Sequence, residues 1–318
     1  FQSGRSEKSG RKLRLADDAC IISLLVASAV AAGLAWRLTR PLRQIEGAMV
    51  QAASGDLNVR ISESVKGSSS EFIELAKKFD MMAATIQQLI DRQQNLFHSV
   101  SHELRSPLAR INCAVELARR SPDITPKMLD RIESDVQKLD SLVGDLLTYT
   151  RLNAEVSIPF SEIDVSEIVE DIADNASLEG DARKIQVICD LPKDDLIMTG
   201  NADLLAHAIE NVVRNALRFS PDGGKVTIQG GMVSDSSLQI SVQDEGPGIP
   251  QEEMAKIFDP FFRGANQATG SGYGLGLPIT MQAAQHHGGT VHAENILPHG
   301  LKITITLPLK PAGKSEKA

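Results

Sequence analysis

The sequence has few cysteines and no excess of basic residues. Its 318 residues include only three cysteines, Cys20, Cys113 and Cys189. No two of them have the spacing of a metal site or a redox motif, so we expect a reducing compartment, with Cys113 and Cys189 as ordinary core residues. The formal net charge is −8, and bases and acids are interspersed along the chain. No nucleic-acid partner is therefore expected, because such proteins usually carry a basic patch.

The chain does not begin with methionine, and it has only one long apolar run. Phe1–Gly4 resembles the remnant of a cleavable tag, so residues 1–19 are interpreted as that remnant and the end of a missing sensor region. Residues 20–36 carry no charge and end in Trp36. A run of roughly 17 apolar residues is the lower limit for crossing a bilayer. We predict a transmembrane helix over residues 20–36, in contact with membrane lipid; a buried soluble helix is the alternative.

Two helices joined by a polar connector are predicted over residues 37–91. Apolar residues recur at helical spacing from Pro41 to about Ala53, and again from Phe72 to Leu89. Between these stretches lie Gly55-Asp56-Leu57 and Gly67-Ser68-Ser69-Ser70. A helix, a connector and a helix directly after a predicted membrane span resemble the HAMP relay module of bacterial receptors.

Residues 92–155 are predicted to form a helical hairpin. The first helix has one apolar stripe from Leu96 to Val115, and the second alternates three- and four-residue steps from Leu129 to Leu146. A turn at Ser121–Pro126 joins them, with Thr125 as the expected N-cap. Because one hairpin buries such stripes poorly, we expect two copies to pair as a dimeric four-helix bundle.

After about Asn153, strands and helices alternate. Strands are predicted at Gln186–Cys189, Val226–Gln229, Leu238–Val242, Thr290–Ala293 and Lys302–Leu307. Helices are predicted near Ser166–Asn175, Ala202–Phe219, Gln251–Ile257 and Pro278–His286. The run His286-His287-Gly288-Gly289 is interpreted as a helix end with glycine caps rather than a metal pair. The pattern indicates one α+β domain over residues 158–310, followed by a disordered tail over residues 311–318.

His102, on the first helix of the hairpin, is a candidate nucleophile. At about 100° per residue it lies about 170° from the centre of the apolar stripe, so its ring is expected to face outward. Glu103 follows it, and Pro107 lies in mid-helix, where proline costs roughly 3 kcal/mol or more. A neutral imidazole nitrogen can attack phosphorus while a carboxylate takes the proton. From its position alone, the interpretation of His102 as a surface histidine without a function has equal weight.

The neighbours of His102 form a specific string. Ser101-His102-Glu103-Leu104-Arg105-Ser106-Pro107-Leu108 resembles the phosphoacceptor box of bacterial two-component sensor histidine kinases. The resemblance implies that His102 accepts a phosphoryl group and that Glu103 is the base. It places Ser106 where the family usually has Thr or Asn, which is thought to hold the water that dephosphorylates the partner regulator. Because Ser lacks the methyl group that restricts χ1, we expect a working but weak phosphatase.

The predicted helix Ala202–Phe219 carries polar residues on one face. Asn211, Asn215 and Arg218 recur there. Such amides are often only caps or solvated residues, but their oxygens suit Mg²⁺, and Arg suits phosphate. The segment resembles the Asn box of the same family. The resemblance implies Asn215 as the Mg²⁺ ligand supported by Asn211, Arg214 and Arg218 near the phosphates of ATP, and Phe219 on adenine.

Glycine-rich segments flank an aromatic cluster. Asp244 follows a predicted strand and could accept a hydrogen bond from the adenine amino group, while Gly246 and Gly248 let the base approach. Ile257–Arg263 resembles the family's aromatic box at the base of a lid, here Gly264–Thr269, and Arg263 is implied to reach the phosphates. Gly270–Leu277 resembles the second glycine box; no Gly-Lys-Ser/Thr follows, so it is not a Walker loop. The implied nucleotide contacts there are Gly272, Tyr273, Gly274, Leu275 and Gly276.

These boxes occur in the family's order over about residues 37–310, and within the family the sequence resembles the envelope-stress sensor kinases. The resemblance implies a multi-domain chain: a membrane-span helix, an all-α HAMP module, a dimeric four-helix bundle, and an α/β-sandwich (α+β) ATP-binding domain of the gyrase, chaperone and histidine kinase type. It implies that Mg²⁺·ATP phosphorylates His102 and that the phosphate passes to an Asp of a cognate response regulator. The expected location is the bacterial inner (cytoplasmic) membrane, with the C-terminal part in the cytoplasm.

Two other classes of function remain open. An ATP-driven clamp shares the nucleotide fold, but a clamp has no use for the His102 helix. A non-catalytic membrane relay would not need intact Asn, Asp and Gly boxes.

Overall fold

The computed structural model describes residues 4–67, 69–154, 158–193, 195–264 and 272–310, and the side chains among them from residue 24 on, Pro122 excepted. The start of the predicted tag remnant (residues 1–3), residues 265–269 of the predicted lid, Gly270 and Ser271 of the glycine box, and the predicted tail lie outside the described residues. The chain divides into two compact units, Phe1–Phe97 and His98–Ala318, and each is treated by itself.

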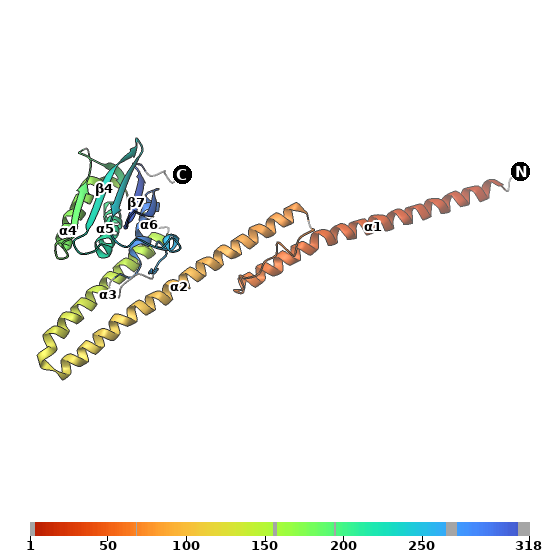
Figure 1. Cartoon of the computed structure of the whole chain (residues 1–318). Coiled ribbons are helices and arrows are strands. Elements are labelled where there is room, and N and C mark those ends of the chain that lie inside the picture. Colours follow the sequence, from red (N-terminus) through yellow and green to blue (C-terminus); the bar gives the residue numbers. More distant parts are fainter. Residues whose placement is uncertain (1–3, 68, 155–157, 194, 265–271, 311–318) are drawn as a thin grey trace. The chain divides into compact units, whose positions relative to one another are not determined.

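The first unit consists of helix α1 (Gly4–Ala53), a connector, and the first part of helix α2 (Ser70–Arg120) (Figure 1). Its core unites α1, the connector and α2 through Ile45, Ala48, Leu57, Ile61, Val65, Ala76, Phe79 and Ala83. The carboxylate of Asp80 on α2 accepts hydrogen bonds from the backbone N–H groups of Ile61 and Ser62, at 2.8 and 3.0 Å. The connector is therefore packed on the helices, as expected for the predicted relay module.

The predicted membrane span lies within α1. Among the residues that the structure describes, no helix has a stretch long and apolar enough to cross a bilayer. The side chains of residues 20–23, at the start of the predicted span, lie outside the described residues. The span over residues 20–36 therefore stays a prediction.

In the second unit, α2 and helix α3 (Thr125–Asn153) form the predicted hairpin, joined by the short 3₁₀ helix η1 (Pro122–Ile124). The prediction of Thr125 as N-cap is wrong. Ile124 occupies that position without a side-chain hydrogen bond, and the Thr125 hydroxyl instead donates to the carbonyl oxygen of Ala118 at 3.1 Å. The hydroxyl thus satisfies a carbonyl left open in the last turn of α2.

The hairpin buries a different line of α3 from the predicted seam. Met128, Asp135 and Leu142, seven residues apart, are buried. Leu129, Val136 and Val143 of the predicted seam are 57%, 51% and 45% exposed. One chain therefore leaves these three seam residues exposed, as the pairing of two hairpins requires, while Ile132, Leu139 and Leu146 are half-buried.

The remainder of the second unit is a five-stranded sheet of order β2-β4-β5-β7-β6 with helices packed on it (Figure 1). The strands are β2 (Gln186–Asp190), β4 (Lys225–Ser234), β5 (Ser237–Gln243), β6 (Thr290–Asn295) and β7 (Leu301–Pro308). The helices are α4 (Val165–Asp181), α5 (Ala202–Phe219) and α6 (Gly276–His286). A separate two-stranded sheet pairs β1 (Ser161–Asp164) with β3 (Ile197–Gly200). This arrangement is the predicted α/β sandwich.

Strand register explains how the sheet builds its core. Ile228, Val242, Ile303 and Ala293 pair in a row across β4, β5, β7 and β6, and all four are buried. Since side chains alternate across a strand, each strand sends one set inward against the helices. Thr280 in α6 is fully buried, and its hydroxyl donates to the carbonyl oxygen of Ala208 in α5 at 2.9 Å, which joins the two helices.

Three predictions for this unit are corrected. The helix predicted at Gln251–Ile257 is only a short 3₁₀ turn, η2 (Met254–Lys256). Strands β1 and β3 were not predicted. Cys113 and Cys189 are exposed rather than core residues. Cys189 lies near the end of β2, an edge strand of the sheet.

Candidate functional site

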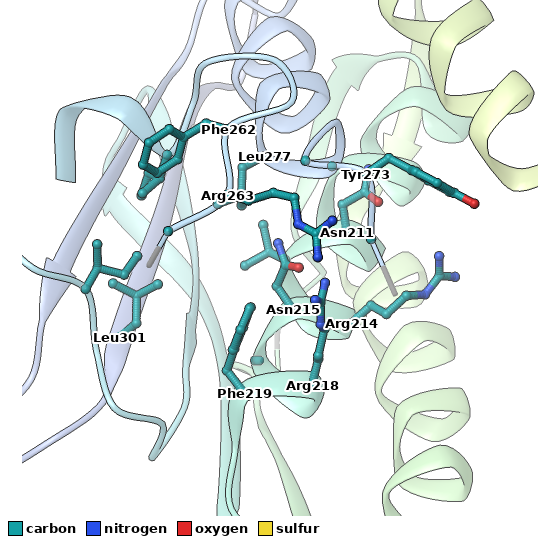
Figure 2. A pocket seen from close by; sticks show the side chains of 18 of the residues that line it. Asn211, Arg214, Asn215, Arg218, Phe219, Phe262, Arg263, Tyr273, Leu277 and Leu301 are labelled. Atoms are coloured by element: carbon teal, nitrogen blue, oxygen red, sulfur yellow. The ribbon is translucent and has the colours of Figure 1, made fainter. Parts of the chain in front are cut away.

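A cavity of about 1070 Å³ lies in the second unit. It is bounded by α5, the loop after β5, residues 257–264 and 272–276, and the hairpin helices α2 and α3. Figure 2 shows the cavity with Asn215 and Arg218 of α5 below the side chain of Arg263, and Asn211 of the same helix beside it. Most residues predicted as nucleotide contacts therefore come together around one space.

The amides of α5 lie at the back of this cavity. Helix α5 is held by its buried face on the sheet and by Asn201, whose side-chain oxygen accepts from the N–H of Leu204. Asn211 is 7% exposed, and its Nδ2 is the buried side-chain polar atom without a hydrogen-bond partner among the described residues. An unpaired buried N–H donor costs free energy, so this atom indicates a place for a hydrogen-bond acceptor, such as a phosphate oxygen or a water. Asn215, one turn further on, is half-buried.

Two guanidinium groups face the same space. Burial, and then the charge of Arg263, hold the pKa of Arg218 below its usual value. Figure 2 shows the guanidinium of Arg263 directed toward Asn215 and Arg218. Like charges this close repel, and a bound phosphate would relieve the repulsion. Arg214 also lines the cavity, but its side chain is exposed and pairs with Glu210.

Phe219 lies beneath Arg218, at 5.0 Å from the guanidinium carbon to the ring centre. The Phe219 ring lines the cavity and is half-buried. It thus offers an apolar surface next to the cationic end of the space.

Asp244 lies behind the loop that follows β5, and it is 5% exposed. Its Oδ1 accepts hydrogen bonds from the backbone N–H groups of Gly246 at 2.7 Å and Leu301 at 3.1 Å. Burial raises the pKa of this carboxyl group, and the two hydrogen bonds partly oppose that rise. Gly246 must remain glycine, because a Cβ there would lie 2.8 Å from the carbonyl oxygen of Phe219. Glycine thus lets the backbone after Asp244 run close to the end of α5.

The glycine-rich segment before α6 runs close to other residues of the cavity. Gly272 has φ 113°, and a Cβ there would collide with Nη1 of Arg218. Gly274 has φ 72°, and a Cβ there would lie 2.6 Å from the carbonyl oxygen of Phe262. Gly276 approaches Asn211, because its Cβ would lie 3.1 Å from Oδ1. Only glycine fits the first two positions without strain.

Two predicted contacts of this segment have side chains that point elsewhere. Leu275 is buried in a core cluster with Ile279 of α6 and Leu142 of α3. Tyr273 extends from the segment toward α3, as Figure 2 shows, and its hydroxyl donates to the carbonyl oxygen of Lys138 at 3.1 Å. Burial raises the pKa of the Tyr273 hydroxyl, and the charge of Glu103 adds to the rise. The segment is thus attached to the hairpin.

His102 is exposed on α2, as the helical spacing predicted. Its ring centre lies 4.6 Å from that of His98, one turn earlier. Glu103 lines the cavity, and its Oε1 lies 4.0 Å from Nη1 of Arg263. The residue next to His102 therefore approaches the cationic end of the cavity.

Ser106 also lines the cavity, one turn after His102. Its hydroxyl oxygen accepts a hydrogen bond from Nη1 of Arg110 at 2.8 Å. This contact corrects the freedom expected for the Ser106 side chain, because a rotation about χ1 would break the bond.

The chain matches three protein families in sequence. Residues 33–88 match the HAMP domain, residues 92–155 the His Kinase A (phospho-acceptor) domain, and residues 200–311 the histidine kinase-, DNA gyrase B-, and HSP90-like ATPase. It is 34% identical to Sensor histidine kinase CpxA of Escherichia coli (strain K12) over 291 residues, which are 91% of this chain and 62% of CpxA. The chain belongs to the sensor histidine kinase family. The resemblance to bacterial sensor histidine kinases that the sequence indicated is confirmed.

Other sensor kinases are similar over comparable lengths. The histidine-protein kinase/phosphatase MprB of Mycolicibacterium paratuberculosis (strain ATCC BAA-968 / K-10) is 31% identical over 92% of this chain and 58% of its own length. The chain thus spans about three fifths of the length of CpxA and MprB. Among solved structures, histidine kinase ThkA in complex with response regulator protein TrrA has a TM-score of 0.58 at 21% identity, covering 71% of this chain and 64% of that one. The Acinetobacter baumannii histidine kinase AdeS has a TM-score of 0.54 at 23% identity, over 65% of this chain and 98% of that one. These likenesses show the fold.

Sequence reasoning missed several residues that organise this kinase-family site. Asn295 of β6 holds the loop after β5: its Oδ1 accepts from the N–H of Ile249 at 2.8 Å, and its Nδ2 donates to the Ile249 carbonyl oxygen at 2.7 Å. No local signal could reveal it, because the pairing depends on the sheet. The position of Arg110 could have been recognised from the sequence, because it lies four residues after Ser106 and eight after His102 on one helix face.

Proposed function

We propose that the protein is an ATP-dependent protein-histidine kinase that phosphorylates its own His102 and passes the phosphate to an Asp of a cognate response regulator. The observation that carries this proposal is the approach of Arg263 to Glu103 at 4.0 Å. One cavity thereby contains the convergent Arg side chains that suit ATP phosphates and, at its edge, the residue beside a solvent-exposed histidine. The ATP-driven clamp does not account for that histidine.

The transfer requires a neutral imidazole, because only an unprotonated ring nitrogen has the lone pair that attacks phosphorus. One ring nitrogen attacks the γ-phosphorus of ATP, a P–N bond forms, and the P–O bond to ADP breaks with its electron pair on ADP. Glu103 takes the proton from the other ring nitrogen. Arg218 and Arg263 compensate the negative charge of the phosphates, so the protein contributes mainly positioning and electrostatics.

The donor set suits Mg²⁺ bound together with ATP. No cluster of three or more His, Cys, Asp or Glu side chains with metal-binding geometry occurs within the described residues. Mg²⁺ in nucleotide sites usually keeps several waters and takes only one or two protein ligands besides the phosphates. We propose Asn215 as the protein ligand, with the buried amide of Asn211 holding a coordinated water. The ion would supply charge neutralisation at the phosphates.

Adenine is proposed to enter between the loop after β5 and the glycine-rich segment. Asp244 would accept a hydrogen bond from the adenine amino group, with Gly246 and Gly248 lining the plane of the base and Phe219 packing on it. The glycine segment, with Gly272, Gly274 and Gly276, would present backbone N–H groups to the phosphates at the start of α6. Arg214, Tyr273 and Leu275 would contribute less, because their side chains have other partners.

A homodimer and a response regulator are the proposed protein partners. The exposed apolar residues of the hairpin, such as Val136 and Val143, support pairing through residues 92–155. The relay module, residues 37–91, likewise leaves Leu42, Met49 and Met82 about half exposed. The solved ThkA structure contains the response regulator TrrA, and MprB is named a kinase/phosphatase. We therefore propose that this chain also dephosphorylates its regulator, with Ser106 holding the attacking water. No nucleic acid is proposed as a partner.

A location at the bacterial inner membrane is part of the proposal, with residues 158–310, the catalytic domain, in the cytoplasm. Exposed apolar side chains on α1 support this location. Leu24, Val30 and Trp36 are 68%, 61% and 67% exposed, and contact of such a surface with water alone is unfavourable. Arg40 lies over the Trp36 ring at 5.2 Å, a pairing suited to a membrane interface. The named relatives are described as sensor kinases, which agrees with this location.

A single labelling experiment tests the proposed reaction. The full chain is incubated with γ-labelled ATP and Mg²⁺, and the label is then exposed to acid and to base. A phosphohistidine is lost in acid and survives in base, which separates it from phosphoserine. A chain that takes up no label, or takes up acid-stable label, would refute the kinase.

A further inference from the structure

A partly exposed arginine pairs with a buried carboxylate in the hairpin, beside Ser106. Asp135 of α3 is 3% exposed, and Arg110 of α2 donates to its carboxylate from Nε at 3.1 and 3.2 Å and from Nη2 at 2.9 Å. This hydrogen bonding raises the pKa of Arg110 and lowers the pKa of Asp135. The remaining nitrogen, Nη1, donates to the Ser106 hydroxyl at 2.8 Å. One guanidinium therefore connects Ser106 to a buried carboxylate on the other helix.

Stability alone does not account for this pair. Asp135 occupies a buried position between Met128 and Leu142, where an apolar residue would fill the same line of α3. A buried ion pair replaced by apolar residues often leaves stability unchanged or higher. A buried polar pair can specify helix register, but register would need only Arg110 and Asp135. The third donor, directed at Ser106, has no part in register.

We propose that Arg110, held by Asp135, is a positioning residue that orients the Ser106 hydroxyl for removal of phosphate from the response regulator. The inference rests on the proposed phosphatase function. Because Oγ of Ser106 accepts from Arg110, its hydrogen is directed to another acceptor, which is a water. The hydrogen bond from Arg110 holds Oγ of Ser106 in place, and it thereby restricts χ1 as the methyl group of a threonine would.

The water held by Ser106 attacks the phosphorus of the regulator's phospho-Asp. A P–O bond forms to the water oxygen, and the P–O bond to the carboxylate breaks with its electron pair on the carboxylate. The water proton passes to solvent, and the products are inorganic phosphate and the unmodified regulator. Arg110 touches none of the reacting atoms; it acts by limiting where the Ser106 hydroxyl, and so the water, can lie.

The test replaces the pair rather than Arg110 alone, because among the described residues the buried Asp135 carboxylate would then keep only Lys138, at 3.9 Å, as a cationic partner. Arg110→Met with Asp135→Leu removes both charges and fills the space. Glu116→Leu with Arg119→Met is the matched control, since these residues form an exposed ion pair on α2. Arg110→Lys is a second variant, because one ammonium can neutralise Asp135 but cannot also reproduce the fork to Ser106. Thermal melting shows whether each variant folds.

The probe is the regulator that accepts label fastest from the phosphorylated full chain. The loss of label from the phosphorylated regulator is followed with excess ADP at several regulator concentrations. We expect the pair replacement to lower the maximal dephosphorylation rate about 10- to 100-fold without changing KM, and the Lys variant to lower it less. Adding Ser106→Thr to the pair replacement should restore most of the rate, because the threonine methyl group restores the missing restriction. In a Ser106→Ala background, the pair replacement should have no further effect.

Three results would overturn the inference while leaving the kinase intact. The first is a wild-type dephosphorylation rate in the pair replacement. The second is a further loss of this rate when the pair replacement is added to Ser106→Ala. The third is a failure of Ser106→Thr to restore the rate in a pair replacement that is folded. A wild-type chain that labels His102 but never dephosphorylates the regulator would remove the phosphatase and this inference together. A chain that takes no label from ATP would refute the proposed function itself.

Discussion

Replacement of Asp244 by asparagine gives a direct test of the nucleotide site. Both hydrogen bonds to this side chain, from Gly246 and Leu301, fall on Oδ1. An asparagine carbonyl oxygen can accept the same two bonds, so the loop after β5 should keep its shape. The change falls on the other carboxylate oxygen, which becomes an NH₂ group. A donor would then face the amino group of adenine, where a charged acceptor had been.

The expected loss follows from the strength of that one interaction. A hydrogen bond to a charged group contributes about 1.5–3 kcal/mol. This range corresponds to an ATP affinity weaker by about 10- to 150-fold. Titration calorimetry of the full chain with ATP and Mg²⁺ measures it. Asp235→Asn, an equal charge change in the exposed turn between β4 and β5, is the control and should bind ATP as the wild type does.

The same substitution should raise the stability of the nucleotide-free protein, although it weakens ATP binding. Burial raises the pKa of Asp244 above its unfolded value, so the ionised group disfavours the empty folded state once the pH exceeds the folded pKa. Asp244→Asn should therefore raise the melting temperature of the nucleotide-free protein near pH 7, and this gain should vanish below the unfolded pKa of about 3.9. Unchanged ATP affinity would refute the assigned role. A loss of both affinity and stability would mean that the loop had collapsed.

The other predictions concern His102, the hairpin and His287. His102→Ala should take up no label while its ATP affinity stays at the wild-type value, because the ring lies outside the nucleotide cavity; labelled variant protein would contradict this. The full chain should scatter light as a dimer at micromolar concentration and Val136→Asp as a monomer, since a charge would enter the paired seam; a monomeric wild type would exclude the dimer. Burial lowers the pKa of His287, whose Nε2 accepts from the N–H of Asn201 at 3.0 Å. Stability should therefore be complete above about pH 6.5 and fall as the pH drops toward the folded pKa, and His287→Gln should flatten this fall; an equal fall in both proteins would contradict it.

Sequence periodicity was sufficient to predict those elements whose structure depends mainly on their own residues. The range predicted for α5, Ala202–Phe219, is the range observed, because its apolar positions recur at helical spacing and Asn201 caps its start. The exposed position of His102 followed from helix geometry in the same way. The five strands of the main sheet were found because their inward residues alternate.

Short and paired elements were not accessible to this reasoning. Strands β1 and β3 have four residues each and pair only with each other, so neither has a pattern long enough to identify alone. The segment Gln251–Ile257 has helical spacing, yet most of it forms turns and only η2 is a 3₁₀ helix. Its conformation depends on the cavity wall that it forms with Phe262 and Arg263.

The sequence by itself determined the order of the modules, the family, and the residue types at the site, because short strings around His102, Asn211 and Asp244 carry that chemistry within one helix or loop. Only the tertiary structure decided which side chains share a space. It brought Arg263 to Glu103, turned Tyr273 toward α3, and joined Ser106 through Arg110 to Asp135. The contacts made by Arg263, Tyr273 and Asp135 each join two elements that are distant in sequence or two different helices, and their geometry depends on how helices and sheet pack. Periodicity within one element contains no information about that packing.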